Sequence, residues 1–280
     1  MVAVNETEGV LAAARAATEA DGVAPLSEHA LLAVRAGRPG EVVAEGGTVV
    51  AYGRFDPATD DEPASGELFV HPDHRRKGRG RALLRALREQ AGGPLRVWAH
   101  GDLPAAAALA SAEGMTRARA LFQLRRPAEG PLPEPQVADG VTLRTFQPGR
   151  DEDAWLRVNA RAFASHPEQG AWTIDDLRER ESEPWFDPAG FFLAERDGDL
   201  VGFHWTKVQP DGLGEVYVVG VDPSAQGLGL GRALTLTGLH HLRAQGLPRF
   251  MLYVDESNTA AVRMYESLGF TPHTVDVMYA

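Results

Sequence analysis

Residues 216–234 read VYVVGVDPSAQGLGLGRAL and determine the fold expected of this chain. The apolar run is typical of a buried strand, Pro223 ends it, and a Gln-x-x-Gly-x-Gly loop leads directly into residues that favour a helix. Backbone N–H groups at a helix N-terminus bind anions, and glycine allows phosphate oxygens to approach them. The stretch therefore predicts a strand, a pyrophosphate-binding loop and a helix, in which Arg232 adds positive charge near the phosphates.

The same pattern occurs a second time in the chain. Residues 70–84 read VHPDHRRKGRGRALL, and residues 221–235 read VDPSAQGLGLGRALT, with matching Val, Pro, Gly, Gly, Arg, Ala and Leu positions at a constant offset of 151 residues. A single glycine-rich loop can occur without any ligand. Two loops followed by the same Arg-Ala-Leu indicate a duplicated domain.

The two copies are separated by a stretch with a different composition. Residues 125–140 read RRPAEGPLPEPQVADG, which is rich in Pro and Gly and typical of a linker. A chain of 280 residues is also long enough for two ordinary domains. We therefore expect a first domain at residues 1–127, a linker at 128–140 and a second domain at 141–280.

Each copy has strands and helices in a similar order. In the second copy, strands are predicted at 141–146, 191–208 (a hairpin), 212–223, 249–255 and 270–279, and helices at 151–164, 173–183, 231–246 and 258–269. The first copy has a predicted hairpin at 41–55, strands at 66–72 and 94–100, helices at 80–93 and 104–114, and a closing segment at 115–125. This order predicts an α/β (α+β) fold with two tandem domains, each a mixed, mostly antiparallel sheet flanked by helices.

Composition excludes several classes of function. The formal net charge of −11 argues against nucleic acid or an anionic membrane as the main partner. The chain contains no cysteine, which excludes disulfides, thiolate catalysis and cysteine metal sites. His240 and His241 are adjacent and cannot form the i, i+4 pair of a helical zinc site, so no metal is expected. Because neither a signal peptide nor a membrane-spanning stretch is recognisable, we expect a cytoplasmic protein.

The glycine-rich loops are similar to motif A of the GCN5-related N-acetyltransferases (GNAT), (R/Q)xxG(x)(G/A). Arg75, Gly78 and Gly80 fit it in the first copy, and Gln226, Gly229 and Gly231 fit it in the second. This resemblance implies acetyl-CoA as the acetyl donor, with its pyrophosphate on the loop and its pantetheine arm along the preceding strand. The positions implied are Val219, Gly220, Val221, Gln226, Gly227, Leu228, Gly229, Leu230, Gly231 and Arg232, with Leu68, Phe69, Val70, Arg75, Arg76, Lys77, Gly78, Arg79, Gly80 and Arg81 in the first copy.

Residues 252–270, LYVDESNTAAVRMYESLGF, are similar to motif B of the same family. The resemblance implies that Tyr265 protonates the departing thiolate. Tyr265 follows Asn258 by seven residues, about two helical turns, which predicts that both face the same side. An ordinary buried helix tyrosine is the alternative. The implied coenzyme A contacts are Asn258, Thr259, Ala260, Ala261, Val262 and Arg263.

An attacking ammonium must lose a proton, so acetyl transfer needs a base. Glu215 is the candidate, because it lies on the strand that leads into the second glycine loop. Alternation along a strand places Glu215, Tyr217 and Val219 on one face unless a bulge intervenes. An exposed glutamate without a catalytic role is the alternative.

The first copy lacks this predicted catalytic set. The alignment places Leu103 opposite Asn258, Ala110 opposite Tyr265 and Ala64 opposite Glu215. We therefore expect the first domain to retain an anion site but no catalysis, and to have a structural or regulatory role.

Over nearly its whole length the chain resembles the mycothiol synthase family of tandem GNAT proteins. That resemblance implies acetylation of the cysteinyl amine of a cysteinyl-glucosaminyl-inositol, with the first domain closing one side of the substrate site. The alternatives are an acetyltransferase acting on another small-molecule or protein N-terminal amine, and a non-catalytic acetyl-CoA sensor. We expect a monomer with a small-molecule partner. The implied substrate contacts are Glu28, Glu168, Lys207, Glu215 and Tyr253.

Overall fold

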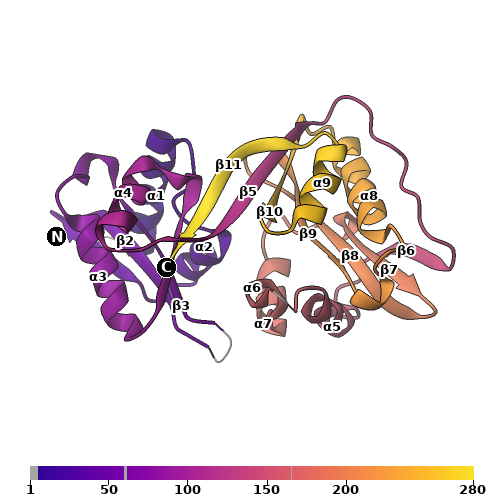
Figure 1. Ribbon diagram of the computed structural model, residues 1–280, viewed down its shortest axis with the longest axis horizontal. Helices are drawn as coiled ribbons and strands as arrows, with labels where there is room; N and C mark the ends of the chain where they lie inside the picture. Colours follow the sequence, from indigo (N-terminus) through magenta and orange to yellow (C-terminus); the bar gives the residue numbers. More distant parts are fainter. Residues whose placement is uncertain (1–5, 60–61, 165) are drawn as a thin grey trace. The chain divides into compact units, whose positions relative to one another are not determined.

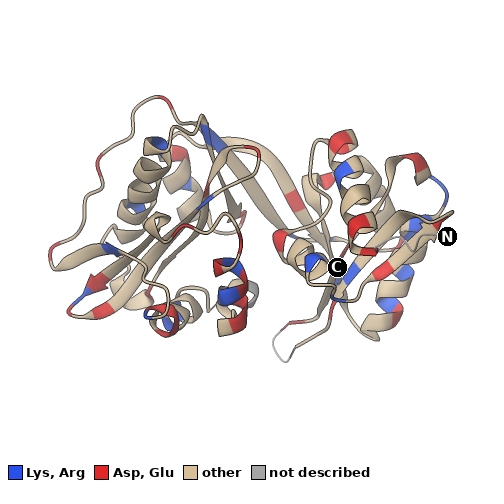
Figure 2. Ribbon diagram, turned by 180° about the vertical axis from the view of Figure 1, so that it is seen from behind, with Lys and Arg blue, Asp and Glu red and all other residues tan. Residues whose placement is uncertain are grey.

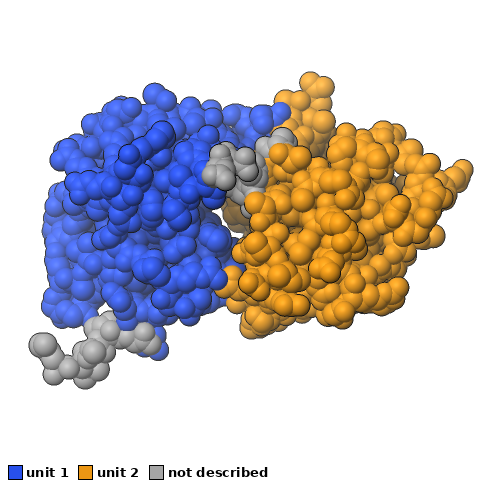
Figure 3. Space-filling model, turned by 90° about the horizontal axis from the view of Figure 1, so that it is seen from below, with its two compact units in different colours: residues 1–122, 255–257, 274–280 blue, residues 123–254, 258–273 orange. Residues whose placement is uncertain are grey.

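The computed structural model describes residues 6–59, 62–164 and 166–280, and the chain divides into two compact units (Figure 1, Figure 3). Unit 1 comprises Met1–Phe122, Asp255–Ser257 and Thr274–Ala280, and unit 2 comprises Gln123–Val254 and Asn258–His273. Each unit contains a mixed sheet with helices on both faces. The predicted α/β fold is therefore confirmed.

Unit 1 is built on the antiparallel strands β1, β2 and β3, followed by β4, which is parallel to β3. Helices α1 and α2 pack on one face of this sheet, and α3 and α4 pack on the other. The segment that forms α1 and α2 has no helix predicted from the sequence. The elements are α1 (Glu6–Asp21), α2 (Glu28–Arg35), β1 (Glu41–Glu45), β2 (Thr48–Asp56), β3 (Ala64–Val70), the 3-10 turn η1 (Pro72–His74), α3 (Arg79–Ala91), β4 (Leu95–Ala99), η2 (His100–Asp102) and α4 (Pro104–Ala112).

Unit 2 repeats this scheme with the antiparallel strands β6, β7, β8 and β9, followed by β10, which is parallel to β9. One face carries an aromatic core with α5 and α7, and α8 covers the other face. The elements are β6 (Val141–Thr145), α5 (Glu152–Ala162), α6 (Pro167–Gly170), α7 (Ile174–Glu181), η3 (Pro188–Gly190), β7 (Phe191–Arg196), β8 (Asp199–Val208), β9 (Leu213–Val221), η4 (Pro223–Ala225), α8 (Leu230–Ala244), β10 (Arg249–Asp255) and α9 (Thr259–Ser267).

Two long strands, β5 (Arg117–Pro127) and β11 (Thr271–Tyr279), contribute residues to both units. The end of β11 belongs to unit 1, where Val277–Tyr279 pair antiparallel with β4. The units therefore differ from the contiguous halves expected from the sequence, in which residues 270–279 close the second sheet. Alternating apolar residues identify a strand but do not specify its partner, so the pattern could not show this exchange.

The segment between β5 and β6 lies within unit 2, and its role as a linker between two domains stays a prediction. Residues 128–140 contain no helix or strand, although β5 extends to Pro127, three residues into the Pro- and Gly-rich stretch. Acidic and basic residues are interspersed on both units (Figure 2), so the net charge is not concentrated in one element. Along the described parts of the chain, the helices lack the length and apolar character that crossing a bilayer requires.

Candidate acetyl-transfer site

The site is built where β9 and β10 separate. Their parallel ladder joins Leu213–Val216 to Arg249–Leu252, and in the described residues it does not continue past Val216, although β9 extends to Val221. The edge of β9 at Val219, Gly220 and Val221 is therefore open to another extended chain. These are the positions that the sequence assigns to the pantetheine arm.

A β-bulge at Tyr217 coincides with this separation. Across the ladder with β8, Trp205 pairs with Val218 and Thr206 pairs with Val216, so Tyr217 is the extra residue. A bulge bends its strand and shifts the side-chain alternation beyond it. The expectation that Val219 shares a face with Glu215 and Tyr217 is therefore wrong, because Val219 pairs with His204, whose ring bonds to Leu234 O of α8 on the opposite face.

The second glycine loop has a backbone that requires glycine at two positions. Gly227 and Gly229 have φ angles of 83° and 69°, values in the left-handed region, and Gly229 is the N-cap of α8. Gly231 does not have a left-handed φ. A Cβ added there would meet only Val221 Cγ2 at 3.7 Å, an ordinary contact. Packing within the protein thus leaves room at Gly231, which fits close approach of a ligand to the first turn of α8.

Arg232 extends from the first turn of α8 toward α9. Its Nη1 donates a hydrogen bond to Ser267 Oγ at 2.8 Å. Asp222, just before the loop, accepts from Ser224 N at 2.9 Å and pairs with Arg161 of α5. These contacts connect the loop to both neighbouring helices.

Glu215 and Lys207 form a directly opposed pair on β9 and β8, so their side chains share a face. Both are buried, and Gln209 Nε2 donates a hydrogen bond to Glu215 Oε2. The Lys207 Nζ lies 4.5 Å from the centroid of the Trp185 ring and 5.1 Å from that of Tyr217. The predicted base is therefore a buried carboxylate opposite a buried lysine on the neighbouring strand, not an exposed strand-end glutamate.

Arg180 of α7 contacts Tyr217, the ring against which Lys207 lies, and the sequence does not predict this position. Its side chain is buried, its Nε donates to the Tyr217 hydroxyl at 2.9 Å, and its guanidinium carbon lies 3.8 Å from the Trp172 ring centroid. Nothing in the acidic and basic pattern of residues 173–183 distinguishes Arg180 from a surface arginine. The tryptophans on either side of it, Trp172 and Trp185, are the available signal.

Tyr265 lies inside α9 and is buried, with its ring 5.9 Å from that of Phe270. Burial raises the pKa of Tyr265 to about 12, and a hydrogen bond with Thr235 opposes part of that rise. Thr235 Oγ1 in turn donates to Gly231 O at 2.8 Å. The phenol is thus connected through one side chain to the first turn of α8, and it carries its proton at neutral pH.

The residues at the start of α9 are exposed. Asn258 is the N-cap, and its Oδ1 accepts from Ala261 N at 3.1 Å. Asn258 is exposed and Tyr265 is buried, and the expectation that they face the same side stays a prediction. Arg263 is exposed.

The first glycine loop has the same backbone but a different electrostatic setting. Arg76 and Gly78 have φ angles of 61° and 80°, and Gly78 is the N-cap of α3. Three of its predicted phosphate-binding guanidinium groups already pair with carboxylates in unit 1. These pairs are Arg75 with Asp21, Arg79 with Glu45 and Arg81 with Glu113.

The structure also locates the catalytic differences between the copies. Leu103 is the N-cap of α4 and Ala110 is buried in that helix, which matches the positions of Asn258 and Tyr265 in α9. The third match was one residue off: Ser65 pairs with Asp56 just as Glu215 pairs with Lys207, so Ser65 and not Ala64 corresponds to Glu215. The bulge at Tyr217 causes this shift, because the ladder between β2 and β3 has no register change.

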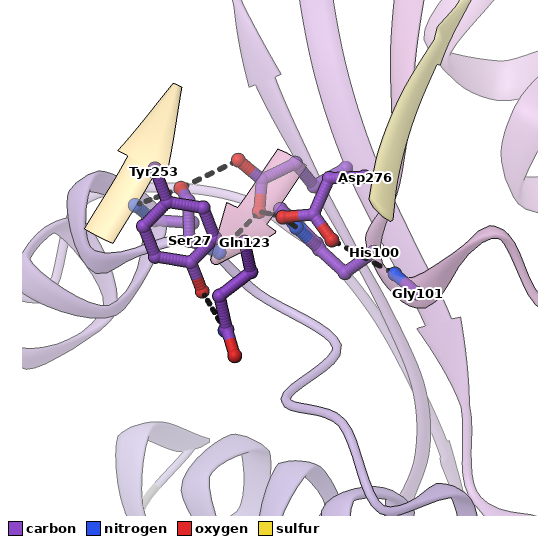
Figure 4. A network of polar contacts seen from close by, with 8 residues as sticks. Ser27, His100, Gly101, Gln123, Tyr253 and Asp276 are labelled. Atoms are coloured by element: carbon purple, nitrogen blue, oxygen red, sulfur yellow. Dashed lines mark hydrogen bonds and ion pairs between the residues drawn. The ribbon is translucent and has the colours of Figure 1, made fainter. Parts of the chain in front are cut away.

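The predicted substrate contacts are distributed over both units. Lys207 and Glu215 lie together in unit 2, and the exposed Tyr253 hydroxyl accepts from Gln123 Nε2 at 2.8 Å (Figure 4). Glu28 begins α2 in unit 1, and its contact with substrate stays a prediction. Glu168 lies in α6, but its side chain is outside the described residues.

A buried polar network in unit 1 was also missed. His100 lies between two buried carboxylates, with Nδ1 at 2.9 Å from Asp276 and Nε2 at 3.3 Å from Glu67 (Figure 4). Glu67 also accepts from Ser27 N at 2.7 Å, and Asp276 accepts from Gly101 N at 2.8 Å. Burial lowers the pKa of His100, but the two carboxylates outweigh it and raise the pKa to about 10. These residues are far apart in sequence, so no local pattern indicates them.

The chain matches two GNAT family models. The model described as "Acetyltransferase (GNAT) family" matches residues 155–270, and the model described as "Acetyltransferase (GNAT) domain" matches residues 39–122. A tandem GNAT protein from the clavulanic acid biosynthesis pathway superposes with a TM-score of 0.73 at 23% identity, over 99% of this chain and 96% of that one. This likeness shows the fold.

Relatives similar over almost their full length define the family. The mycothiol acetyltransferase of Thermomonospora curvata is 71% identical over 96% of this chain and 92% of that protein. The mycothiol acetyltransferase of Thermobispora bispora is 61% identical over 98% of this chain and 95% of that protein. The chain therefore belongs to the GNAT acetyltransferases and, within them, to the mycothiol acetyltransferase family.

Proposed function

We propose that this acetyltransferase moves the acetyl group of acetyl-CoA to the cysteinyl amine of desacetylmycothiol, the cysteinyl-glucosaminyl-inositol that precedes mycothiol. The observation that carries the proposal is the 71% identity to a mycothiol acetyltransferase over 96% of the chain. Unit 2 retains Glu215 and Tyr265, whereas unit 1 has Ser65 and Ala110 at those positions. We place the reaction in unit 2, and a cytoplasmic monomer stays a prediction from the sequence.

The acetyl donor binds along the open edge of β9 and across the second glycine loop. Backbone groups of Val219 and Val221 pair with the pantetheine amides, and N–H groups at the start of α8 bind the pyrophosphate. The space at Gly231 supports this position of the pyrophosphate, because a Cβ added there would have Val221 as its one close protein neighbour. The thioester then lies near the bulge at Tyr217, where β9 and β10 separate.

Glu215 serves as the base in this proposal. Its carboxylate accepts a proton from the substrate ammonium, directly or through water, and the free amine attacks the thioester carbonyl carbon. The C–N bond forms, the C–S bond breaks, and the second nitrogen proton passes to the sulfur. The proton on Glu215 is released to solvent, so the reaction yields an amide, a thiol and one proton.

Tyr265 stabilises the departing sulfur mainly by donating a hydrogen bond. A phenol with a pKa of about 12 is a weaker acid than an ordinary thiol, whose pKa is about 8.5, so complete proton transfer to the thiolate is uphill by roughly 5 kcal/mol. A hydrogen bond to a developing anion avoids this cost. This adjusts the role implied by family resemblance from proton donor to hydrogen-bond donor.

A substrate panel tests the proposed function. The full chain is incubated with acetyl-CoA and desacetylmycothiol, a polyamine, an aminoglycoside or a peptide N-terminus. The acetylated product is measured by chromatography, because the thiol of desacetylmycothiol would interfere with a thiol reagent. We expect the highest kcat/KM with desacetylmycothiol. Equal values for all amines would contradict the assigned substrate, and no product with any amine would contradict acetyl transfer.

A further inference from the structure

Cations and aromatic rings alternate on the aromatic face of unit 2, between α7 and the strands β8 and β9. The row consists of Trp172, Arg180, Tyr217, Lys207 and Trp185, and we call it the cation–ring row. Arg180 stacks on Trp172 at 3.8 Å and donates Nε to the Tyr217 hydroxyl at 2.9 Å. Lys207 Nζ lies 5.1 Å from the Tyr217 ring centroid and 4.5 Å from that of Trp185.

Both cations of the row are removed from water. The relative exposures of Arg180 and Lys207 are 4% and 6%. Burying a charge is costly unless other groups repay the lost hydration. For Arg180, the lost hydration is compensated by the contacts with Tyr217 and Trp172 and by a hydrogen bond from Nη1 to Asp176 O at 2.9 Å. The rings on either side of Lys207 provide cation–π attraction, which is stronger in a desolvated setting.

The row ends at the proposed base. Lys207 is the direct cross-strand partner of Glu215, and such partners have Cβ atoms about 4.5–5.5 Å apart. Gln209 donates a hydrogen bond to the Glu215 carboxylate, and Met251 is the ladder partner of Glu215 on β10. A cation on the same face of the neighbouring strand favours the ionised carboxylate. The ionised form is the one that can accept a proton.

We propose that Arg180 and Tyr217 are positioning residues that hold the Lys207 ammonium beside Glu215, and so keep this carboxylate ready to accept a proton. The inference rests on the proposed role of Glu215 as the base. Arg180 acts through Tyr217, because its hydrogen bond fixes the phenol against which Lys207 packs. The same hydrogen bond holds the bulged residue of β9 in place.

The pH dependence of kcat/KM for desacetylmycothiol at saturating acetyl-CoA tests this role. Arg180→Gln removes the guanidinium, Tyr217→Phe keeps the ring but removes the hydroxyl, and Lys207→Met removes the ammonium. Arg144→Gln is the matched control, because Arg144 on β6 is also a paired arginine of unit 2. It pairs with Asp151, the N-cap of α5, and with Glu195 of β7. Ionisation of the substrate is common to all variants and cancels in the comparison.

Loss of the neighbouring cation makes Glu215 protonate at higher pH, so the acidic limb of the profile moves to higher pH. We expect about 1 to 2 pH units for Lys207→Met and about half a unit for Arg180→Gln and Tyr217→Phe. Arg144→Gln is expected to leave the limb in place. If Arg180→Gln and Tyr217→Phe lower kcat/KM but leave the acidic limb in place, the inference is overturned, and Arg180 and Tyr217 have only a structural role.

Glu215→Gln separates failure of this inference from failure of the mechanism. If Glu215→Gln loses the acidic limb and most of its turnover while Arg180→Gln behaves like the control, the base is right and the positioning role is wrong. If Glu215→Gln keeps both its rate and its acidic limb, Glu215 is not the base, and the positioning role fails with it.

Discussion

Gly231→Ala separates binding of the acetyl donor from stability of the fold. Gly231 lies in the first turn of α8 with no positive φ, and an added Cβ would meet only Val221 Cγ2 at 3.7 Å. Alanine favours a helix over glycine by up to about 1 kcal/mol. The free energy of unfolding should therefore stay constant or rise, and Tm should increase by at most about 4 °C.

The same methyl group would occupy the place where phosphate oxygens approach the loop. A lost hydrogen bond to a charged group costs about 1.5–3 kcal/mol, so KM for acetyl-CoA should rise at least about tenfold. Differential scanning fluorimetry without ligand measures Tm, and initial rates over a range of acetyl-CoA concentrations measure KM. An unchanged KM would refute the assignment of the loop to the donor, and a lower Tm would refute the steric argument.

A second glycine of the same helix serves as the control. Gly238 lies against the fully buried His204, and an added Cβ would collide with the imidazole ring. Overpacking of this kind costs about 1–3 kcal/mol. Gly238→Ala is therefore expected to lower Tm, whereas Gly231→Ala is expected to lower donor affinity.

Three further predictions follow from the contacts described above. Tyr265→Phe should lower kcat by roughly 10- to 150-fold, the effect of losing one hydrogen bond to an anion, with little change in KM. Steady-state rates test this, and a larger loss of kcat would show that Tyr265 transfers its proton completely. The pKa of His100 is about 10 in the folded protein against 6.5 in the unfolded chain. Its contribution to the free energy of unfolding is therefore complete below about pH 6.5 and is lost as pH rises toward about 10. Urea unfolding from pH 6 to 10 should show this decline in free energy in the parent but not in His100→Gln. Titration calorimetry with acetyl-CoA should find two sites per chain, the weaker in unit 1, because Arg75, Arg79 and Arg81 already pair with carboxylates; one site would rule out donor binding by unit 1.

Local patterns predicted the glycine loops, the strands that precede them and the helices that follow. The left-handed backbone at Gly78 and Gly229 and the N-cap positions of Leu103 and Asn258 agree with the alignment of the two copies. These features depend on residues close in sequence, where turn and capping preferences act directly.

Features that depend on distant residues could not be predicted in this way. The bulge at Tyr217 adds one residue to β9. As a result, Val219 lies on the opposite face from the one expected, and the residue of unit 1 that corresponds to Glu215 is Ser65 instead of Ala64. The partner of a strand is not encoded in its alternation, so the exchange of β5 and β11 was missed. His100 and Asp276 are 176 residues apart, and their contact depends on that exchange.

The matched pair Glu215→Gln and Ser65→Ala tests most directly whether acetyl transfer occurs in unit 2. These residues occupy corresponding ladder positions, opposite Lys207 and Asp56 respectively. The measurement is the initial rate of acetylated product from desacetylmycothiol at saturating acetyl-CoA. We predict that Glu215→Gln loses most of the turnover and that Ser65→Ala retains the parent rate. Equal losses in the two variants, or a loss confined to Ser65→Ala, would contradict a single working site in unit 2.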